Sequence, residues 1–278
     1  MSILQAILLG IVEGVTEFLP VSSTGHLTIT ERLLGFRIDA ADITAFTAII
    51  QVGAVAAVII YFWDDLWAIV RSLFAGLTDA QRRSDRDFRY GLAVAVGSIP
   101  IAIVGLAFRH QIEGPLRSLW VVGTALIVWS GVLWLADRSA RQDRGEDDFG
   151  MPDGLAMGIT QCIALVPGVS RSGATIAAGL FRGLDRVTVT RMSFFLAIPA
   201  LTAAGLFEAV TKASDISNGI GWGPTLVGVV VSFVVAYVAV AWFLRYVGRH
   251  TFGIFIAYRV ILGVIVLGVV ATGLTGAR

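Results

Sequence analysis

The chain has 278 residues, of which 56% are hydrophobic and only 15% are charged, and its mean hydropathy is +0.81. A soluble protein of this length would carry about 25% charged residues. The composition therefore excludes an ordinary soluble domain and predicts an all-α polytopic membrane protein. The net charge of +1 implies no bulk attraction to nucleic acid. The single cysteine, Cys162, excludes an intrachain disulfide.

The chain begins with two short helical segments instead of a full span. Residues 2–16 form an apolar helix, Pro20 interrupts it, and a second segment follows at about 24–34. A broken pair of short helices at membrane depth predicts a re-entrant hairpin, which is tolerated only where it lines a cavity or is buried in protein. The alternative is an amphipathic helix at the membrane interface, with its glutamates in water.

Three spans follow the first hairpin, at residues 42–62, 90–108 and 118–137. The polar connection between the first two, residues 64–89, holds apolar side chains at helical spacing, which predicts a helix lying at the interface. A hydrophilic linker begins after 137 and is the sharpest change of composition in the chain.

The same pattern restarts after the linker. Residues 152–166 form another short apolar helix, broken at Pro167-Gly168 and continued over 172–182, and three spans follow at 190–211, 223–245 and 252–273. We therefore predict one membrane domain over 1–278, made of a first repeat (1–137), a polar linker (138–151) and a second repeat (152–278).

The two halves also match in residues. Val21-Ser22-Ser23-Thr24-Gly25 aligns with Val169-Ser170-Arg171-Ser172-Gly173, and at the same offset Glu13 meets Gln161 and Glu17 meets Leu165. The second copy lacks the carboxylates and has gained an arginine. Because each half holds three spans, an odd number, the second half should be inverted in the membrane.

The distribution of positive charge supports this inverted topology. If the 64–89 connection is cytoplasmic, that side of the membrane collects thirteen arginines: Arg71, Arg82, Arg83, Arg86, Arg89, Arg138, Arg141, Arg144, Arg182, Arg186, Arg191, Arg245 and Arg249. The other side keeps Arg32, Arg37, Arg109, Arg117, Lys212 and Arg278. Positive charge favours the cytoplasmic side, so the first hairpin should enter from outside and the second from the cytoplasm, with their tips meeting near the midplane.

Hydroxyl groups cluster at both predicted tips. Ser22, Ser23 and Thr24 lie just before one helix, and Ser170 and Ser172 lie at the equivalent place in the second copy. Hydroxyls there cap free backbone N–H groups, and two facing helix N-termini make a pocket suited to phosphate. The alternative is that these small residues only pack the hairpins closely.

Arg171 argues against a packing role alone. A guanidinium binds phosphate in a bidentate manner, and a buried arginine without an anion is expensive.

Two carboxylates lie beside this predicted phosphate pocket. Glu13 and Glu17 are four residues apart and share one helix face. They would repel a phosphate unless a divalent cation, Mg²⁺ or Ca²⁺, lay between them. Without a metal, one carboxyl would stay protonated or pair with Arg171.

Two further polar residues have candidate roles. His26 follows the Ser-Thr pair closely enough to act as general base or acid, and Ser23 is the natural candidate nucleophile, although the sequence does not rank them. Arg259 lies early in its span, where its side chain could extend to the interface and contact a lipid phosphate or support the site.

The motifs E-G-V-T-E-F-L-P-V-S-S-T-G-H (13–26) and P-G-V-S-R-S-G-A-T (167–175) resemble those of the bacterial undecaprenyl-diphosphate phosphatase family, also called the bacitracin-resistance protein family. The resemblance extends over essentially the whole chain. It implies two interlocked inverted repeats and removal of the terminal phosphate from a polyprenyl diphosphate carrier lipid of cell-wall synthesis.

The resemblance also implies a role for each site residue. Glu13 and Glu17 would hold the divalent metal or assist proton transfer, and Ser23 or His26 would act as nucleophile or base. Arg171 would bind the diphosphate. The pocket would be lined by Ser22, Thr24, Ser170, Ser172 and Thr175.

The resulting expectation is a metal-dependent phosphatase of the bacterial inner (plasma) membrane, with a site open to the periplasmic face. Its partners would be the polyprenyl diphosphate substrate and membrane lipids, with a homodimer left open. The alternative function is a transporter or flippase of the carrier lipid, because inverted repeats and re-entrant hairpins are transporter architecture. A pure carrier, however, has no need of a carboxylate pair, a nucleophile and a histidine together.

Overall fold

The computed structural model describes residues 1–38, 40–108, 111–112, 116 and 118–272. Two short helices form the first hairpin, α1 (Ile3–Thr16) and α2 (Ser23–Leu33). The rest of the first half consists of α3 (Ala41–Tyr61), α4 (Trp63–Thr78), the short 3₁₀ helix η1 (Ala80–Ser84), α5 (Arg86–Ala107) and α7 (Leu119–Ser139).

The second half begins with η2 (Glu146–Asp148) in the linker. Its hairpin consists of α8 (Met151–Gln161), η3 (Cys162–Leu165) and α9 (Arg171–Phe181). The remaining helices are α10 (Arg186–Thr211), α11 (Ala213–Asn218), α12 (Trp222–Val247) and α13 (Gly253–Ala271).

Six of the described helices are long and apolar enough to cross a membrane: α3, α5, α7, α10, α12 and α13. Each lies within a few residues of a predicted span, which confirms the prediction of an all-α polytopic membrane protein. The short helix α11 was not predicted.

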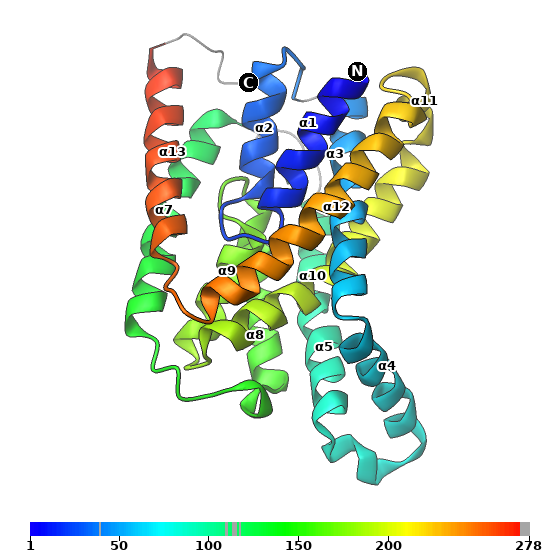
Figure 1. The fold of residues 1–278 in the computed structure, drawn as a ribbon, viewed down its shortest axis with the longest axis vertical. Coiled ribbons are helices and arrows are strands. Elements are labelled where there is room, and N and C mark those ends of the chain that lie inside the picture. Colours follow the sequence, from blue (N-terminus) through cyan, green and yellow to red (C-terminus); the bar gives the residue numbers. More distant parts are fainter. Residues whose placement is uncertain (39, 109–110, 113–115, 117, 273–278) are drawn as a thin grey trace.

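The connection between α3 and α5 contains the predicted helix, as α4, and this helix has a packing partner that the sequence analysis did not predict. Only Phe62 separates α3 from α4, and α4 packs along α5. The Phe88 ring lies against Gly76, and Ile69 and Leu73 lie against Gly91. The two helices thus form an antiparallel pair that projects beyond the rest of the molecule (Figure 1).

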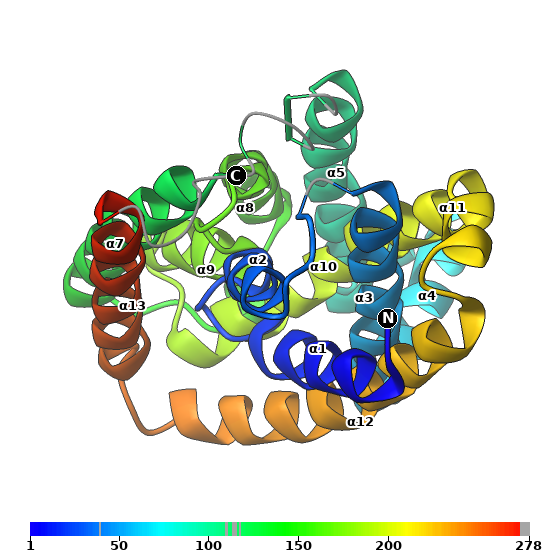
Figure 2. The same ribbon diagram turned by 90° about the horizontal axis from the view of Figure 1, so that it is seen from above.

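The two hairpins enter the bundle from opposite ends. In Figure 1, α1 and α2 occupy the upper half of the molecule, whereas α8 and α9 occupy the lower half. Seen from above, the hairpin helices lie near the middle of the molecule, with the long helices around them (Figure 2). This arrangement brings the two tips, 17–22 and 166–170, to the centre of the bundle.

The hairpins are interlocked with the opposite halves of the chain. The first hairpin helix, α1, packs on α12, and its counterpart α8 packs on α5. At both contacts a glycine allows the backbones to approach: a Cβ atom at Gly14 would lie 2.7 Å from the Ser232 carbonyl oxygen, and one at Gly158 would lie 1.9 Å from the Gly97 carbonyl oxygen. Such small-residue contacts are typical of close helix packing in membranes. Each hairpin therefore packs against a long helix from the other half of the chain.

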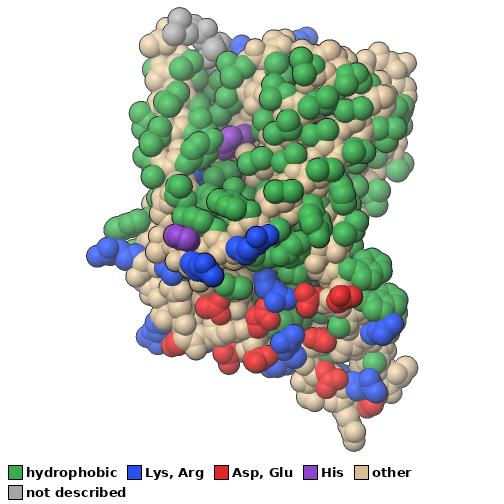
Figure 3. All heavy atoms as spheres, viewed as in Figure 1, with side chains coloured by type: hydrophobic (Ala, Val, Ile, Leu, Met, Phe, Trp, Pro, Cys, Tyr) green, Lys and Arg blue, Asp and Glu red, His purple; other side chains and the backbone are tan. Residues whose placement is uncertain are grey.

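Charged side chains gather at the lower end of the molecule, while apolar side chains cover the upper part (Figure 3). At that end, Arg186 forms an ion pair of 2.7 Å with Asp137, and Arg191 forms one of 2.8 Å with Glu146. The base of the second hairpin is held there by Asp153, which pairs with Arg144 at 2.8 Å and also with Arg182. Six basic residues were predicted to lie on the non-cytoplasmic side of the membrane. Three of them, Arg109, Arg117 and Arg278, lie outside the described residues.

Candidate active site

The two hairpin tips have the same backbone construction. Ser22 and Ser170 adopt φ angles of 75° and 77°, which are uncommon for residues other than glycine. Each serine is the N-cap of the following helix: the Ser22 hydroxyl accepts from the Gly25 N–H at 3.3 Å, and the Ser170 hydroxyl accepts from the Gly173 N–H at 3.1 Å. The predicted capping role is confirmed for Ser22 and Ser170, which start α2 and α9 at the point where the tips meet. The Ser23 and Ser172 hydroxyls instead donate to acceptors of the first tip.

The tips are in direct contact. The Ser172 hydroxyl, at the start of α9, donates to the Leu19 carbonyl of the first tip at 2.8 Å. This hydrogen bond joins residues 153 positions apart in the chain and brings the free N–H groups of two helix N-termini near one another.

Arg259 of α13 ties both tips together. Its guanidinium donates to the Pro20 carbonyl of the first tip at 3.1 Å, and to the Gly168 and Val169 carbonyls of the second at 3.0 Å each. A fourth hydrogen bond goes to the Ser130 hydroxyl of α7 at 3.1 Å. Arg259 is completely buried. The prediction that its side chain extends to the membrane interface is therefore wrong, because four buried acceptors hold it in the protein interior.

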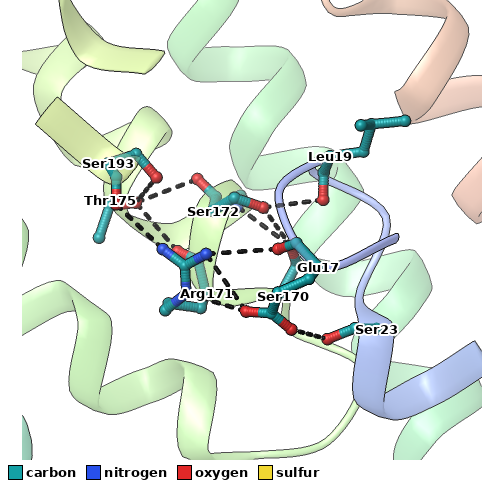
Figure 4. A network of polar contacts seen from close by, with 9 residues as sticks. Glu17, Leu19, Ser23, Ser170, Arg171, Ser172, Thr175 and Ser193 are labelled. Carbon is teal, nitrogen blue, oxygen red and sulfur yellow. Dashed lines mark hydrogen bonds and ion pairs between the residues drawn. The ribbon is translucent and has the colours of Figure 1, made fainter. Parts of the chain in front are cut away.

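A carboxylate of the first tip links the candidate nucleophile to the predicted cation of the second (Figure 4). The Ser23 hydroxyl donates to Glu17 Oε2 at 2.5 Å. The other oxygen, Oε1, accepts from Arg171 Nε and Nη2 at 3.3 Å each. The remaining Arg171 nitrogen, Nη1, donates to the Ser193 carbonyl of α10 at 3.0 Å.

This Ser23–Glu17–Arg171 cluster is almost entirely withdrawn from the surface. The side chains of Glu17 and Arg171 are 4% and 9% exposed, and the Arg171 guanidinium also lies over the Phe18 ring at 5.4 Å. Buried charges of this kind are stable only when paired. Pairing of a carboxylate with Arg171 was the alternative to a metal in the sequence analysis, and the structure contains such a pair at Glu17.

Behind Arg171, a set of hydroxyls fixes the start of α9. The Ser170 and Ser172 hydroxyls lie 3.0 Å apart, and the Thr175 hydroxyl bonds the Ser193 hydroxyl at 2.7 Å and the Arg171 carbonyl at 3.0 Å. Thr175 thus supports the turn that carries Arg171 and is fully buried. Ser193 was missed by the sequence analysis because it lies inside an apolar span without a recognisable motif.

Glu13 lies one helical turn before Glu17 and is fully buried. Neither of its carboxylate oxygens accepts a hydrogen bond from the described residues. A buried carboxylate without a partner is costly, and a divalent cation is one group that would satisfy it. Among the described residues no set of three or more His, Cys, Asp and Glu side chains is arranged to hold a metal. Two carboxylates, Glu13 and Glu17, would leave most coordination positions of a Mg²⁺ ion to substrate phosphates and water, which is how proteins usually bind this ion.

His26 lies apart from this cluster, on the side of α2 that contacts Tyr258 of α13. Its Nδ1 lies 2.7 Å from the Ser22 carbonyl and its Nε2 lies 2.7 Å from the Tyr258 hydroxyl. Because a carbonyl only accepts, Nδ1 carries the proton, and in a neutral ring Nε2 accepts from Tyr258. The two rings are stacked with an interplanar angle of 13°. His26 is therefore near the tip but does not touch Ser23 or Glu17 by any hydrogen bond.

Thr24 also makes no side-chain hydrogen bond to the cluster within the described residues. It lies in the first turn of α2, and its carbonyl accepts from the Thr28 hydroxyl at 2.8 Å. The structure thus brings together Glu17, Ser23, Arg171, Ser170, Ser172 and Thr175, with Glu13 and Ser22 beside them. His26 and Thr24 lie at the edge.

Comparison with known proteins identifies the family of the chain. The family described as bacitracin resistance protein BacA matches residues 6–265. The chain belongs to this family. It is 57% identical to a protein of Frankia casuarinae named undecaprenyl-diphosphatase 3, with both chains covered completely. It is also 54% identical to the undecaprenyl-diphosphatase of Cutibacterium acnes, again over the full length of both chains, and 47% identical to that of Mycobacterium marinum, over all of this chain and 98% of the relative.

Proposed function

We propose that this protein is an integral membrane phosphatase that converts undecaprenyl diphosphate into undecaprenyl phosphate and inorganic phosphate. The observation that carries the proposal is the buried Glu17 carboxylate, which holds Ser23 of its own hairpin and Arg171 of the opposite one. The names of the relatives favour hydrolysis over transport of the lipid. Arg171 and the two helix N-termini supply anion binding, and Ser23 with Glu17 supplies nucleophile chemistry.

The geometry supports Ser23 as the nucleophile and Glu17 as its base. Ser23 Oγ attacks the terminal phosphorus of the diphosphate, and its proton passes to Glu17 Oε2, which is already 2.5 Å away. The bond from that phosphorus to the bridging oxygen breaks, and undecaprenyl phosphate leaves. Water then hydrolyses the phosphoserine, which releases inorganic phosphate and restores the serine. Arg171, which orients Glu17 before the substrate binds, stabilises charge on the transferred phosphoryl group.

His26 takes a supporting part in this proposal. Its Nε2 points to Tyr258 and not to Ser23, so the first proton transfer is assigned to Glu17. His26 and Thr24 lie at the rim of the tip, where they are placed to contact the second phosphate of the substrate. Ser22, Ser170, Ser172 and Thr175 maintain the two helix starts that receive the phosphates.

We also propose a divalent cation, Mg²⁺ or Ca²⁺, held by Glu13 and Glu17. The support is the buried Glu13 carboxylate, which has no described hydrogen-bond partner. When bound, such an ion would offset negative charge on the carboxylates and on the phosphate oxygens.

The protein is multi-pass, and we propose the bacterial plasma membrane as its location, with the site open toward the periplasmic or outer side. The arginine-rich connections and the α4–α5 pair lie at one end of the molecule, and the first hairpin enters from the other end (Figures 1 and 3). Positive charge favours the cytoplasmic side.

Phosphate release from undecaprenyl diphosphate by the purified protein tests the activity. Wild-type protein with Mg²⁺ should release one phosphate per lipid, and Glu17→Gln should reduce kcat by about a hundredfold or more because the base is lost. Acid quenching during turnover should trap phosphoserine at Ser23. Full activity of Glu17→Gln would remove it as base, and phosphate release without any phosphoenzyme would favour direct attack by water.

Metal binding has a separate test that does not depend on activity. Mn²⁺ can replace Mg²⁺ and is followed by its electron paramagnetic resonance signal in the absence of lipid. Glu13→Gln should weaken Mn²⁺ binding, whereas Gln161→Glu, at the equivalent place in the second hairpin, should not create a second site because Leu165 stands where Glu17 would be needed. Equal Mn²⁺ binding by wild type and Glu13→Gln would exclude the metal site.

A further inference from the structure

One turn of α13 reaches the tip of the first hairpin at two neighbouring residues. Arg259 donates to the Pro20 carbonyl, and the hydroxyl of Tyr258, the residue before it, lies 2.7 Å from Nε2 of His26. The Nδ1 atom and the main-chain N–H of His26 both donate to the Ser22 carbonyl, at 2.7 Å and 3.2 Å. Hydrogen bonds therefore connect Tyr258 through His26 to Ser22, which we call the Tyr258–His26–Ser22 connection.

This connection ends at the backbone next to the candidate nucleophile. The Ser22 carbonyl belongs to the peptide that joins Ser22 to Ser23, so the two bonds from His26 fix the direction of that peptide. Ser22 also has a φ of 75°, and a non-glycine residue keeps such a conformation only where surrounding contacts hold it. The direction of the peptide in turn sets where Ser23 Oγ lies relative to Glu17 Oε2, its hydrogen-bond acceptor at 2.5 Å.

The second hairpin forms the same turn without a histidine. The residue equivalent to His26 is Ala174. The Ser170 carbonyl accepts from the Ala174 N–H at 2.9 Å, and alanine has no side chain that could donate a second bond. Ser170 nevertheless has a φ of 77°, close to that of Ser22. The turn itself therefore does not require His26, and the additional bonds belong to the hairpin that carries the candidate nucleophile.

We propose that Tyr258 is a positioning residue for the phosphatase reaction, which acts through His26 to hold Ser23 Oγ toward Glu17. The proposal rests on the proposed function. Tyr258 donates to Nε2 because Nδ1–H is already engaged by a carbonyl, and the two rings stack with centroids 5.5 Å apart. This arrangement keeps the imidazole in one tautomer and one orientation. Because Tyr258 is 45% exposed, loss of its hydroxyl leaves no cavity in the core.

The first experiment removes only that hydroxyl. Tyr258→Phe retains the ring and should lower kcat for phosphate release from undecaprenyl diphosphate by about tenfold, because a reacting group that is less well oriented reacts more slowly. KM should stay within about twofold, since the tyrosine acts on the protein and not on the substrate. The matched control is Tyr246→Phe, because Tyr246 stacks on His250 in a second tyrosine–histidine pair, and its kcat should equal that of wild type. An unchanged kcat in Tyr258→Phe, or an equal loss in the control, would overturn the proposal.

The second experiment asks whether Tyr258 acts through His26. His26→Leu should lower kcat more than Tyr258→Phe does, and adding Tyr258→Phe to His26→Leu should cause no further loss, because the connection is already broken. His26→Asn should recover part of the activity, since its amide can donate to the Ser22 carbonyl in place of Nδ1. Multiplicative losses in the double variant would contradict the proposal.

The third experiment does not depend on activity. His26 is one of only three histidines, so its ring nitrogens can be assigned by ¹⁵N nuclear magnetic resonance through the loss of its signals in His26→Leu. Tyr258→Phe should shift the Nε2 resonance toward that of an imidazole nitrogen without a donor, and Tyr246→Phe should leave it in place. An unshifted Nε2 resonance in Tyr258→Phe would overturn the proposal. If wild-type protein released no phosphate, the proposed function would fail, while this shift would still decide whether Tyr258 holds His26.

Discussion

The two hairpin tips share a backbone and differ in chemistry. Each has a serine N-cap at positive φ, and each cap accepts from the glycine N–H three residues later. At the next position, however, the first hairpin has Ser23 and the second has Arg171. Six residues before Ser23 in the first hairpin is Glu17, whose counterpart in the second is Leu165.

The difference teaches that the repeat builds one site and not two. Because the two hairpins enter the bundle from opposite ends (Figure 1), their helix starts meet at the centre, where Ser23 and Arg171, at equivalent positions, both contact the Glu17 carboxylate. Two identical copies would place either two arginines or two carboxylates there, and like charges would repel. The difference between the two tips therefore pairs one carboxylate, Glu17, with one guanidinium, Arg171.

The largest effect on activity is expected from Arg171, the charged residue that the second hairpin contributes to the site. Arg171→Ala should lower kcat/KM for phosphate release by roughly a thousandfold, because it removes a preorganised cation from the phosphoryl group. Arg171→Lys should recover only part of this, since an ammonium cannot reproduce the bidentate contact. Arg141→Ala in the exposed linker is the control. Unchanged kinetics of Arg171→Ala would remove Arg171 from the site.

The next prediction compares two serines of the first tip, Ser23 as the nucleophile and Ser22 as the N-cap of α2. Ser23→Ala should lower kcat by about a hundredfold or more and abolish any phosphoenzyme, because the nucleophile is lost. Ser22→Ala should instead reduce stability by about 1 kcal/mol and leave kcat within a few-fold of wild type. Ser170→Ala should behave as Ser22→Ala does, because the two caps are equivalent. Similar kinetic losses in Ser22→Ala and Ser23→Ala would contradict this division of roles.

Arg259 joins the two tips, so its removal should affect both at once. Arg259→Met leaves the Pro20, Gly168 and Val169 carbonyls without their donor, and the free energy of unfolding should fall by about 3 kcal/mol. The measurement is thermal unfolding in detergent. Arg245→Met, at an exposed arginine bonded only within its own helix, is the matched control. A melting temperature equal to that of the control would show that the tips hold together without Arg259.

The smallest effect concerns the base of the second hairpin. Burial alone would raise the pKa of Asp153, but hydrogen bonds from Arg144 and Arg182 outweigh it and hold the pKa below the ordinary carboxyl value. The folded state therefore binds this proton more weakly than the unfolded state. The contribution of Asp153 to stability is complete above a pH of about 4 and is lost as the pH falls further.

Hydrogen exchange of the two hairpins checks this pH dependence. Amides of α8 and α9 should lose protection as the pH falls below about 4, whereas those of α1 should change less, since α1 starts with the uncharged capping box of Ser2 and Gln5. Asp153→Asn should be less protected at neutral pH and should show a flatter profile. The same acid response in wild type and Asp153→Asn would assign the effect to another group.

Much of the fold could be predicted because its signals are local. Apolar runs of sufficient length predict the six spans, and Pro20 and Pro167-Gly168 predict the breaks in both hairpins. The projecting α4–α5 pair was predicted only as an interfacial helix, since the contact of Phe88 with Gly76 depends on how two helices pack and not on periodicity.

Some residues of the candidate site could be predicted from the sequence, and others could not. Glu13, Glu17, Ser23 and Arg171 stand out in the sequence because polar residues are rare in apolar surroundings. Ser193 does not stand out in the sequence. It accepts from Arg171 through its main-chain carbonyl, a group that every residue has. Tyr258, the partner of His26, also carries no local signal.

By itself, the sequence determined the membrane class, the six spans, the two hairpins and the complementary residues at their tips, because hydrophobicity and helix-breaking residues act over a few neighbouring positions. Only the tertiary structure decided that Glu17 bridges Ser23 and Arg171, that His26 faces Tyr258, and that Arg259 is buried between the tips. The physical reason is distance along the chain. Arg259 and Pro20 are 239 positions apart, and only the packing of two inverted halves brings the donor to its acceptor.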